Sequence, residues 1–289
     1  MGLTVLKTVE AVRAYRRGLP GRVALVPTMG ALHEGHLRHI HVCRDHADHV
    51  LVSVFVNPTQ FNEKQDYELY PRNLSEDLAR CAEAGADAVF APEVEVLYPS
   101  GAIAAEVDVP VLTADLEGRD RPGHFQGVCR VVVKLLNVVQ PDLVSFGRKD
   151  YQQLCVVRAV IEDLMLPIEI IEIPTVREAD GLAMSSRNLR LSAEERQHAL
   201  GLYKSLLAAK QMVEQEGETD PSLVEDAMVS VMRAHQVDVN YSAIRHPATL
   251  AKLECIEPKL TGGVVALVAG RVGPVRLIDN MLVGQSDSE

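Results

Sequence analysis

The chain has 289 residues, 47% of them hydrophobic, so it is long enough for one large domain or two and can build a substantial core. Its 29 basic and 40 acidic residues give a formal net charge of −11. This balance argues against the broad cationic face that nucleic acid or an anionic membrane requires. We therefore expect neither among its partners.

The cysteines and the charge pattern bear on the compartment. The five cysteines contain no CxxC pair, and an odd number fits free, mostly buried thiols better than a disulfide framework. Charged residues recur at short intervals through the first twenty positions, which leaves no apolar signal core, and no apolar run is as long as a membrane span. These features predict a cytoplasmic protein.

The first 175 residues alternate short β-branched runs with amphipathic stretches. We expect strands at Arg22–Pro27, Val50–Val56, Ala86–Phe90, Asp142–Gly147 and Ile168–Pro174. We expect helices at Gly35–His46, Ser75–Gly85, Phe125–Val139 and Tyr151–Leu164. Strands that are apolar on both faces and separated by helices indicate a parallel sheet covered on each side. The predicted class is therefore α/β, with a Rossmann-like doubly wound domain over residues 1–175.

The pattern changes after Asn188 and predicts a smaller α+β domain over residues 176–289. Ser192 and Glu195 have the spacing of a capping box at the start of a long helix. Gly262-Gly263 predicts a hairpin-like break, and the polar tail Gln285–Glu289 is expected to fray. The expected helices are Ser192–Glu216 and Pro221–His235, and the expected strands are Val237–Ile244, Val264–Ala269 and Val275–Ile278.

The turn between the first predicted strand and helix, residues 28–36, carries two glycines and two histidines. Ligands of open parallel sheets bind at the carboxyl ends of strands, where helix N–H groups face them. Gly30 and Gly35 allow close approach of a phosphate, and His33 and His36 can donate hydrogen bonds from one side of the turn. Taken alone, the segment fits a glycine-rich turn with surface histidines equally well. Zinc ligation is disfavoured, because the spacing is one residue short of HExxH.

Three further segments carry polar groups suited to a ligand. Asn57 and Gln60 follow the second strand, and such amides can donate to a carboxylate and accept from a hydroxyl, although Asn-Pro turn chemistry is the alternative. In the turn after the Asp142–Gly147 strand, Lys149 can neutralise phosphate charge and Asp150 can cap the next helix or bond a ribose, unless this is only a capped turn. Near the domain junction, residues 185–187 offer hydroxyl and guanidinium donors suited to a polyphosphate, which an ordinary polar linker does not explain.

The ten-residue run Pro27–His36, PTMGALHEGH, resembles the opening motif of the pantothenate synthetase family, a variant of the HIGH signature of nucleotidyltransferases. The segments Phe55–Phe61, Phe146–Leu154 and Pro174–Asn188 are similar to further segments of that family, and Met184–Arg187 resembles its counterpart of the KMSKS loop. The resemblance runs from about residue 22 to 191 and is patchier beyond.

The resemblance implies a ligase that forms a C–N amide bond. It would join pantoate to β-alanine with ATP, through a pantoyl-adenylate, and release AMP and pyrophosphate, with Mg²⁺ bridging the phosphates and a homodimer as the assembly. His36 would act as proton donor, beside His33 and the main cation Lys149. Gln60 and Gln153 would bind pantoate, and Gln60 would also bind β-alanine. The implied ATP-binding residues are Met29, Gly30, Ala31, Leu32, His33, Glu34, Gly35, His36, Gly147, Arg148, Lys149, Asp150, Val176, Met184, Ser185, Ser186 and Arg187.

Two positions depart from the family pattern: Arg148 replaces an acidic or neutral residue and Arg130 replaces threonine, so both are expected to add positive charge near the site. The loop Glu117–Phe125 also matches the family, near the acid substrate or the subunit contact, without a catalytic role. Two other functions stay open: a nucleotidyltransferase acting on a phosphorylated acceptor, and a nucleotide-sensing regulator without turnover. The amides of Asn57, Gln60 and Gln153 modestly favour an acid acceptor.

Overall fold

The computed structural model describes residues 2–257 and 262–284, and its chain divides into two compact units. The N-terminal unit comprises Met1–Arg148 and Gln152–Pro174, and the C-terminal unit comprises Lys149–Tyr151 and Thr175–Glu289. The tail Gln285–Glu289, for which fraying is expected, lies outside the described residues. Among the described residues, no helix is long and apolar enough to cross a membrane.

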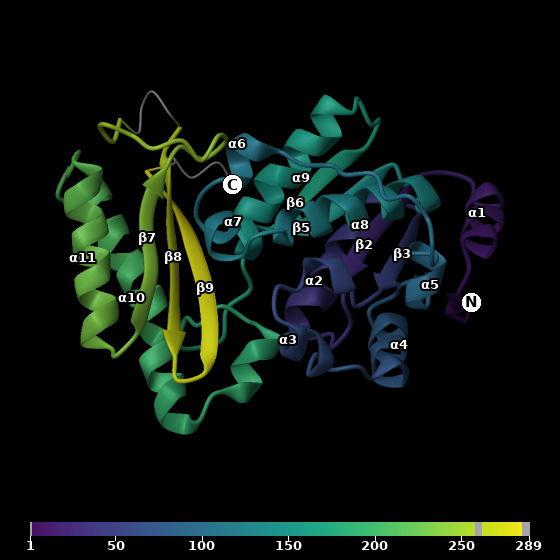
Figure 1. Ribbon diagram of the computed structural model, residues 1–289, viewed down its shortest axis with the longest axis horizontal. Coiled ribbons are helices and arrows are strands. Elements are labelled where there is room, and N and C mark those ends of the chain that lie inside the picture. Colours follow the sequence, from purple (N-terminus) through teal and green to yellow (C-terminus); the bar gives the residue numbers. More distant parts are fainter. Residues whose placement is uncertain (1, 258–261, 285–289) are drawn as a thin grey trace. The chain divides into compact units, whose positions relative to one another are not determined.

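The N-terminal unit is built on a six-stranded sheet with the order β1-β4-β3-β2-β5-β6 (Figure 1). Every neighbouring pair of strands is parallel, which confirms the predicted fold class. The edge strand β1 was not predicted, because three residues are too few for a periodic pattern. The strands are β1 Thr4–Leu6, β2 Val23–Thr28, β3 His49–Val54, β4 Ala88–Phe90, β5 Leu143–Gly147 and β6 Glu169–Ile173.

Helices cover both faces of this sheet. Ala24 and Val26 of β2 pack in one cluster with Ile40 of α2 and Cys81 of α4. Leu25 points to the opposite face by the alternation of a strand, and α8 packs there against β2 and α1 (Figure 1). The longer helices are α1 Val9–Arg17, α2 Glu34–His46, α4 Leu74–Glu83, α8 His124–Val139 and α9 Tyr151–Asp163. The short ones are η1 Pro58–Gln60, α3 Lys64–Glu68, α5 Val94–Leu97, α6 Pro110–Thr113, α7 Glu117–Asp120 and η2 Arg148–Asp150.

The strand order places a topological switch point between β2 and β5. From β2 the chain adds β3 and β4 on one side, and it then returns to add β5 and β6 on the other. In open parallel sheets the crevice outside the carboxyl ends of such strands is the usual ligand site. Both the turn 28–36, after β2, and the turn that begins at Gly147, after β5, start at this switch point.

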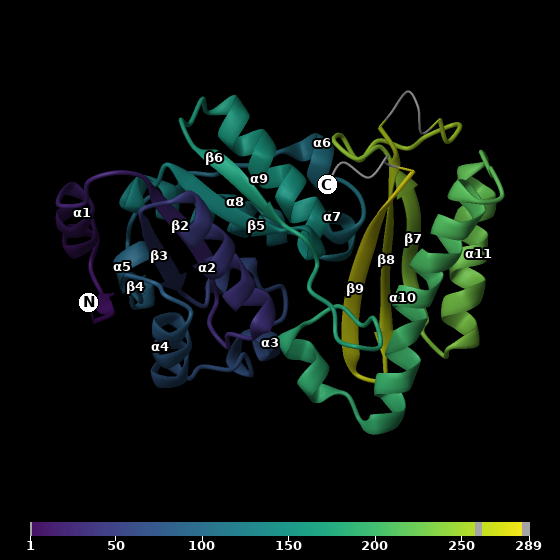
Figure 2. The same ribbon diagram turned by 180° about the vertical axis from the view of Figure 1, so that it is seen from behind.

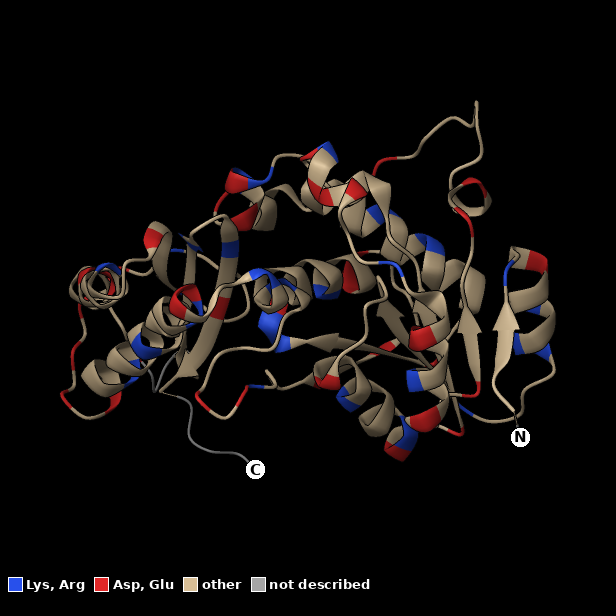
Figure 3. Ribbon diagram, turned by 90° about the horizontal axis from the view of Figure 1, so that it is seen from below, with Lys and Arg blue, Asp and Glu red and all other residues tan. Residues whose placement is uncertain are grey.

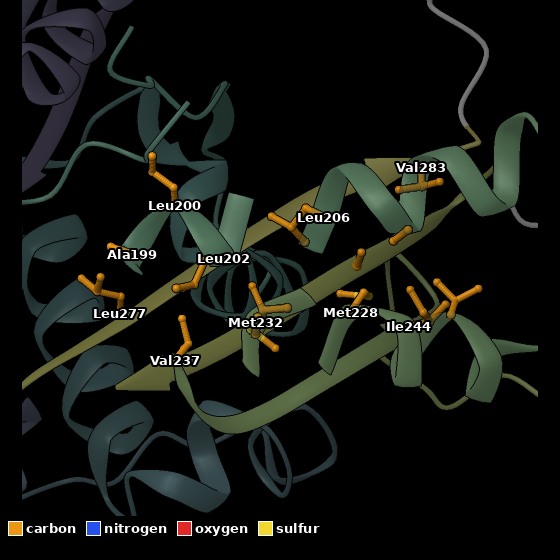
Figure 4. Packing of buried hydrophobic residues seen from close by; sticks show 14 of the residues in the cluster. Ala199, Leu200, Leu202, Leu206, Met228, Met232, Val237, Ile244, Leu277 and Val283 are labelled. Atoms are coloured by element: carbon orange, nitrogen blue, oxygen red, sulfur yellow. The ribbon is translucent and has the colours of Figure 1, made fainter. Parts of the chain in front are cut away.

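The C-terminal unit has a three-stranded antiparallel sheet, β7-β8-β9, with two long helices packed on it (Figure 2). Leu202 and Leu206 of the first helix and Met228 and Met232 of the second are buried in a cluster that includes residues of all three strands (Figure 4). Its elements are η3 Ser186–Arg190, α10 Ala193–Glu214, α11 Pro221–Ala234, β7 Asp238–Arg245, β8 Val264–Val272 and β9 Val275–Val283. Ser192 and its partner three residues later form the predicted capping box of α10.

The predicted break at Gly262-Gly263 lies directly before β8, and a second, tighter turn joins β8 to β9. Gly262-Gly263 ends the long connection from β7 to β8, whereas β8 and β9 are joined directly at Gly273-Pro274. Gly273 has φ of 53° and stands first in the two-residue turn, as in the turns that match the twist of a hairpin. The strand predicted at Val264–Ala269 is too short, because β8 continues through Gly270 to Val272. A Cβ on Gly270 would come within 2.4 Å of Val237, which explains the glycine.

Charged residues are distributed without segregation by sign. Both Lys or Arg and Asp or Glu occur in each unit (Figure 3). Several form i, i+4 pairs on one helix, such as Arg80 with Glu76 at 3.1 Å. Such pairs at exposed positions contribute little to stability and serve solubility.

Candidate functional site

The turn after β2 is held by a buried carboxylate from α4. Gly30 and Ala31 both have positive φ, 80° and 51°, and this directs two successive N–H groups to one place. The N–H of Ala31 donates to Oδ2 of Asp77 at 3.1 Å and the N–H of Leu32 to Oδ1 at 2.8 Å. Asp77 is 2% exposed, and a Cβ on Gly30 would lie 2.8 Å from its Oδ2. A glycine is therefore required where the turn passes this side chain.

Sequence reasoning missed Asp77. The available signal was its place on the buried side of a predicted helix, four residues before the buried Cys81. An acidic residue on an apolar stripe is seldom buried without a partner. Its partners are backbone groups, however, and backbone donors leave no mark in the sequence.

His33 and His36 fix each other at the start of α2. His33 is the N-cap, and its Nδ1 accepts from the Gly35 N–H at 3.1 Å. The His33 N–H donates in turn to Nδ1 of His36 at 3.3 Å, and the ring centroids are 4.1 Å apart. Because Nδ1 of each ring accepts a hydrogen bond, the neutral imidazole carries its proton on Nε2. The two rings are thus arranged as Nε2–H donors on the same turn.

Gly35 has a steric role in this arrangement. A Cβ at position 35 would lie 2.8 Å from Cε1 of His33, so the ring could not fold back to cap the helix. A larger residue would displace the imidazole from the cap.

Asn57 supports the site and is fully engaged within the protein. It is 1% exposed, and its Nδ2 donates to Oε1 of Gln60 at 2.9 Å and to the carbonyl of Gly127 at 3.1 Å. Its Oδ1 accepts from the hydroxyls of Thr59 and Tyr98 at 3.0 and 2.9 Å. These bonds show that Asn57 orients Gln60, and the contact of this amide with the acid substrate stays a prediction.

Gln60 is oriented so that its amide nitrogen is its available donor. With Oε1 occupied by Asn57, Nε2 of Gln60 donates to Sδ of Met29 at 3.2 Å. A thioether is a weak acceptor, so a carboxylate or hydroxyl oxygen would replace it favourably. The ring Nδ1 of His124 lies 2.7 Å from the Gln60 carbonyl, which brings the 117–125 loop to this residue. Gln153 lies half-buried in the first turn of α9.

The two unusual arginines are both held by neighbours in the N-terminal unit. Nε of Arg148 lies 3.0 Å from Oε2 of Glu172, which also pairs with Arg158. The Arg148 guanidinium is thus held by a carboxylate on β6 that it shares with Arg158. Arg130 stacks on the ring of Tyr98, with Cζ 4.9 Å from the centroid. Burial raises the pKa of the Tyr98 hydroxyl, so the phenol stays protonated and donates to the Asn57 amide.

In the C-terminal unit, Lys149 is attached to β9. The Nδ2 of Asn280 donates to the Lys149 carbonyl at 2.7 Å, and the Lys149 ammonium lies 3.5 Å from the Asp150 carboxylate. The hydroxyl of Tyr151 donates to the carbonyl of Pro247 at 3.1 Å. These bonds explain why residues 149–151 belong to this unit although the residues on either side do not.

The polyphosphate-type donors follow a short hairpin in the same unit. Arg177 and Ala183 form an antiparallel bridge, and the Met184 N–H donates to the Val176 carbonyl at 2.9 Å. Ser185 then caps the 3-10 helix η3, its Oγ accepting from the Arg187 N–H at 3.3 Å. The predicted cluster at 184–187 is therefore a defined hairpin end and not a loose linker.

An ion-pair network fixes the base and tip of this hairpin. At the base, Arg177 makes two contacts with the Asp279 carboxylate, at 2.7 and 3.0 Å, and stacks on Tyr203 with Cζ 4.5 Å from the ring centroid. At the tip, Arg196 lies 2.7 Å from the Asp180 carboxylate, and its hydrogen bond holds the pKa of that carboxyl below its usual value.

These features define a class of protein. A doubly wound parallel sheet with a glycine- and histidine-containing turn at its switch point is typical of nucleotide-binding α/β enzymes. The family model that matches the chain, over residues 4–282, is that of pantoate-beta-alanine ligase. The chain belongs to this family.

Known relatives agree along nearly the whole length. A pantothenate synthetase of Moorella thermoacetica is 47% identical over 291 residues, covering 99% of this chain and 100% of the relative. One from Aquifex aeolicus is 49% identical over 90% of this chain and 91% of its own. The crystal structure of pantothenate synthetase from Thermus thermophilus has a TM-score of 0.90 at 45% identity, covering 98% of this chain and 100% of that one.

A ligand-bound structure is also similar. The pantoate-beta-alanine ligase of Francisella tularensis, crystallised with beta-gamma ATP and beta-alanine, has a TM-score of 0.80 at 31% identity, covering 97% of this chain and 98% of that one. Together these matches disfavour the alternatives of a phosphorylated acceptor and of a regulator without turnover.

Proposed function

We propose that this chain condenses pantoate with β-alanine in an ATP-dependent reaction that yields pantothenate, AMP and pyrophosphate. The pantoate carboxylate attacks the α-phosphate of ATP to form pantoyl-adenylate, and the β-alanine amine then displaces AMP. The observation that carries the proposal is the fixed orientation of His33 and His36 at the switch point, where Nδ1 of each ring accepts a backbone N–H, in a chain that belongs to the pantoate-beta-alanine ligase family.

The first step builds negative charge on phosphate oxygens, so fixed donors aimed at that charge are what catalysis needs. His36 and His33 supply two, and His36 is the proton donor. Lys149 is the main cation for the leaving pyrophosphate. The remaining nucleotide contacts are proposed at residues 29–36, 147–150, 176 and 184–187, with backbone groups serving where side chains are otherwise engaged. In particular, Arg148 contributes through its backbone, since its guanidinium pairs with Glu172.

The acid and amine substrates are assigned to the amides. Gln60 and Gln153 bind pantoate, and Gln60 also contacts β-alanine. The geometry of Gln60 supports this, because Asn57 holds its oxygen and leaves the nitrogen donating to a thioether that a carboxylate outcompetes. A site built around a fixed hydrogen-bond donor selects against substrate analogues that lack the matching acceptor group.

Mg²⁺ is proposed to accompany ATP and to neutralise phosphate charge. Among the described residues, no group of three or more His, Cys, Asp or Glu side chains could hold a metal ion. This suits magnesium, which takes phosphate oxygens and water as ligands and needs few from the protein. We further propose a homodimer in the cytoplasm. Light scattering coupled to size exclusion tests the assembly, and the thiol form of all five cysteines fits a reducing compartment.

Isotope exchange tests the proposed function. Pantoate with ATP and Mg²⁺, without β-alanine, should support exchange of labelled pyrophosphate into ATP, because adenylation is a complete and reversible half-reaction. Adding β-alanine should then release AMP and pantothenate in equal amounts. Exchange that required the amine would exclude the two-step scheme, and exchange without pantoate would indicate a different acceptor.

A further inference from the structure

Two adjacent residues of β9, Asp279 and Asn280, carry buried polar side chains with partners outside the strand. They are 3% and 6% exposed. Asn280 donates from Nδ2 to the Lys149 carbonyl at 2.7 Å, across 131 positions of sequence. This bond is one of the links that attach the Lys149 segment to the sheet of the C-terminal unit.

Asp279 fixes a second segment. Its carboxylate accepts hydrogen bonds from both terminal nitrogens of Arg177. The same nitrogens also donate to the Gly181 and Asn280 carbonyls, at 3.0 and 3.2 Å. Arg177 stands at the base of the hairpin that leads to Ser185. A Cβ on Gly181 would lie 2.2 Å from the Tyr203 ring on which Arg177 stacks, so the hairpin is closely packed there.

Stability alone does not account for this arrangement. A buried ion pair contributes little net stability, because removing both charges from water costs about as much as their attraction returns. Burial raises the pKa of the Asp279 carboxyl, and Arg177 and Lys149 oppose the rise. The Arg177–Asp279 pair instead fixes the local geometry, because a bidentate guanidinium–carboxylate contact restricts both the distance and the orientation of the two groups.

We propose that Asp279 and Asn280 are positioning residues for the adenylation step, which hold the Lys149 ammonium and the Ser185–Arg187 donors in one fixed arrangement for the ATP polyphosphate. The inference rests on the proposed role of Lys149. Asn280 acts through the Lys149 backbone, because anchoring the carbonyl fixes the point from which the side chain extends. Asp279 acts through Arg177 on the hairpin. Neither residue is expected to touch substrate.

The first test is selectivity between half-reactions. Misplacing a catalytic group by about 1 Å can cost up to about 10²-fold, so Asn280→Ala should lower kcat for pantoate-dependent pyrophosphate exchange by about 10- to 100-fold. The KM for pantoate and the rate of amide formation from pre-made pantoyl-adenylate should stay unchanged. Asp279→Asn, which keeps the shape but breaks the two-pronged contact, should show the same selectivity. If Asn280→Ala fails to fold, Asn280→Leu, which has the same branched shape and cannot donate, replaces it.

The second test is a double-mutant cycle with Lys149→Ala, which removes the ammonium and leaves the carbonyl. If Asn280 works by positioning that ammonium, Asn280→Ala should have little further effect on exchange in the Lys149→Ala background. Val283→Ala is the matched control, because it removes buried atoms from the same strand at a fully buried position in the unit's core. It should lower the thermal midpoint and leave exchange intact.

The outcomes are distinguishable. Multiplicative effects of the two substitutions, or a loss of exchange in Val283→Ala equal to that in Asn280→Ala, would overturn the inference and leave the proposed function standing. If Lys149→Ala exchanges normally, the role of Lys149 and the inference fall together. If the unmodified protein shows no pantoate-dependent exchange, the proposed function itself is wrong.

Discussion

Replacing Asp77 with alanine removes the side chain that holds both N–H groups of the turn after β2. The Leu32 N–H is buried and the Ala31 N–H is partly buried. A donor left buried without a partner costs about 1–3 kcal/mol. Two such donors, one of them partly reached by water, therefore give a loss of about 3 kcal/mol. This is a large fraction of the roughly 5–15 kcal/mol that typically separates folded from unfolded protein.

The adjacent Glu76 provides the matched control on the same helical turn. Its carboxylate pairs with Arg80 at 3.1 Å and is 54% exposed, so Glu76→Ala should change stability by less than about 1 kcal/mol. Urea unfolding followed by circular dichroism measures both variants. Asp77→Ala should also lose pyrophosphate exchange under conditions where it is still folded, because Ala31, a non-glycine residue at positive φ, needs the carboxylate to keep the turn in this conformation. Equal stability losses in the two variants, or normal exchange by folded Asp77→Ala, would refute this reasoning.

Three further predictions follow from the site and the burial pattern. His36→Ala should lower exchange by about 10²–10³-fold in a folded protein; near-normal exchange would make the histidine structural. Gln60→Ala should weaken pantoate binding in calorimetric titration far more than ATP binding, and the opposite order would reverse the assignment. Burial raises the pKa of four thiols to about 11 or 12: Cys43, Cys81, Cys129 and Cys155. Only the exposed Cys255 should therefore react with a thiol reagent near pH 8 in the native protein, and all five after denaturation; a second fast thiol would contradict the burial.

Several elements could be predicted because their causes are local. The alternation of apolar strands with amphipathic helices indicates a doubly wound sheet, and the Ser192–Glu195 capping box is a contact three residues long. The pairing of His33 with His36 is equally local, since both lie on one helical turn. Short elements such as β1 escaped prediction because three residues define no period.

Some local patterns were interpreted incompletely, because the same residue type can be required for different physical reasons. The break before β8 was predicted from Gly262-Gly263, whereas the tight turn at Gly273-Pro274 was not assigned. The strand predicted at Val264–Ala269 stops short of Gly270, although β8 continues to Val272 and Gly270 is a glycine for lack of space beside Val237. Asn57 carries an amide suited to an acid substrate, but residue type alone does not reveal the protein partners that orient it.

The sequence by itself determined the fold class, the HxGH turn and the residue types available to the chemistry, because these depend on periodicity and on neighbours within one helical turn. Only the tertiary structure decided which side chains are held and by what. Asp77 accepts a hydrogen bond from the turn 46 positions away in the sequence. Arg148 pairs with Glu172, which is 24 positions away, and Asn280 donates to Lys149, which is 131 positions away. Such contacts depend on how strands and helices pack in space, and the sequence of one chain does not indicate which distant residues are brought together.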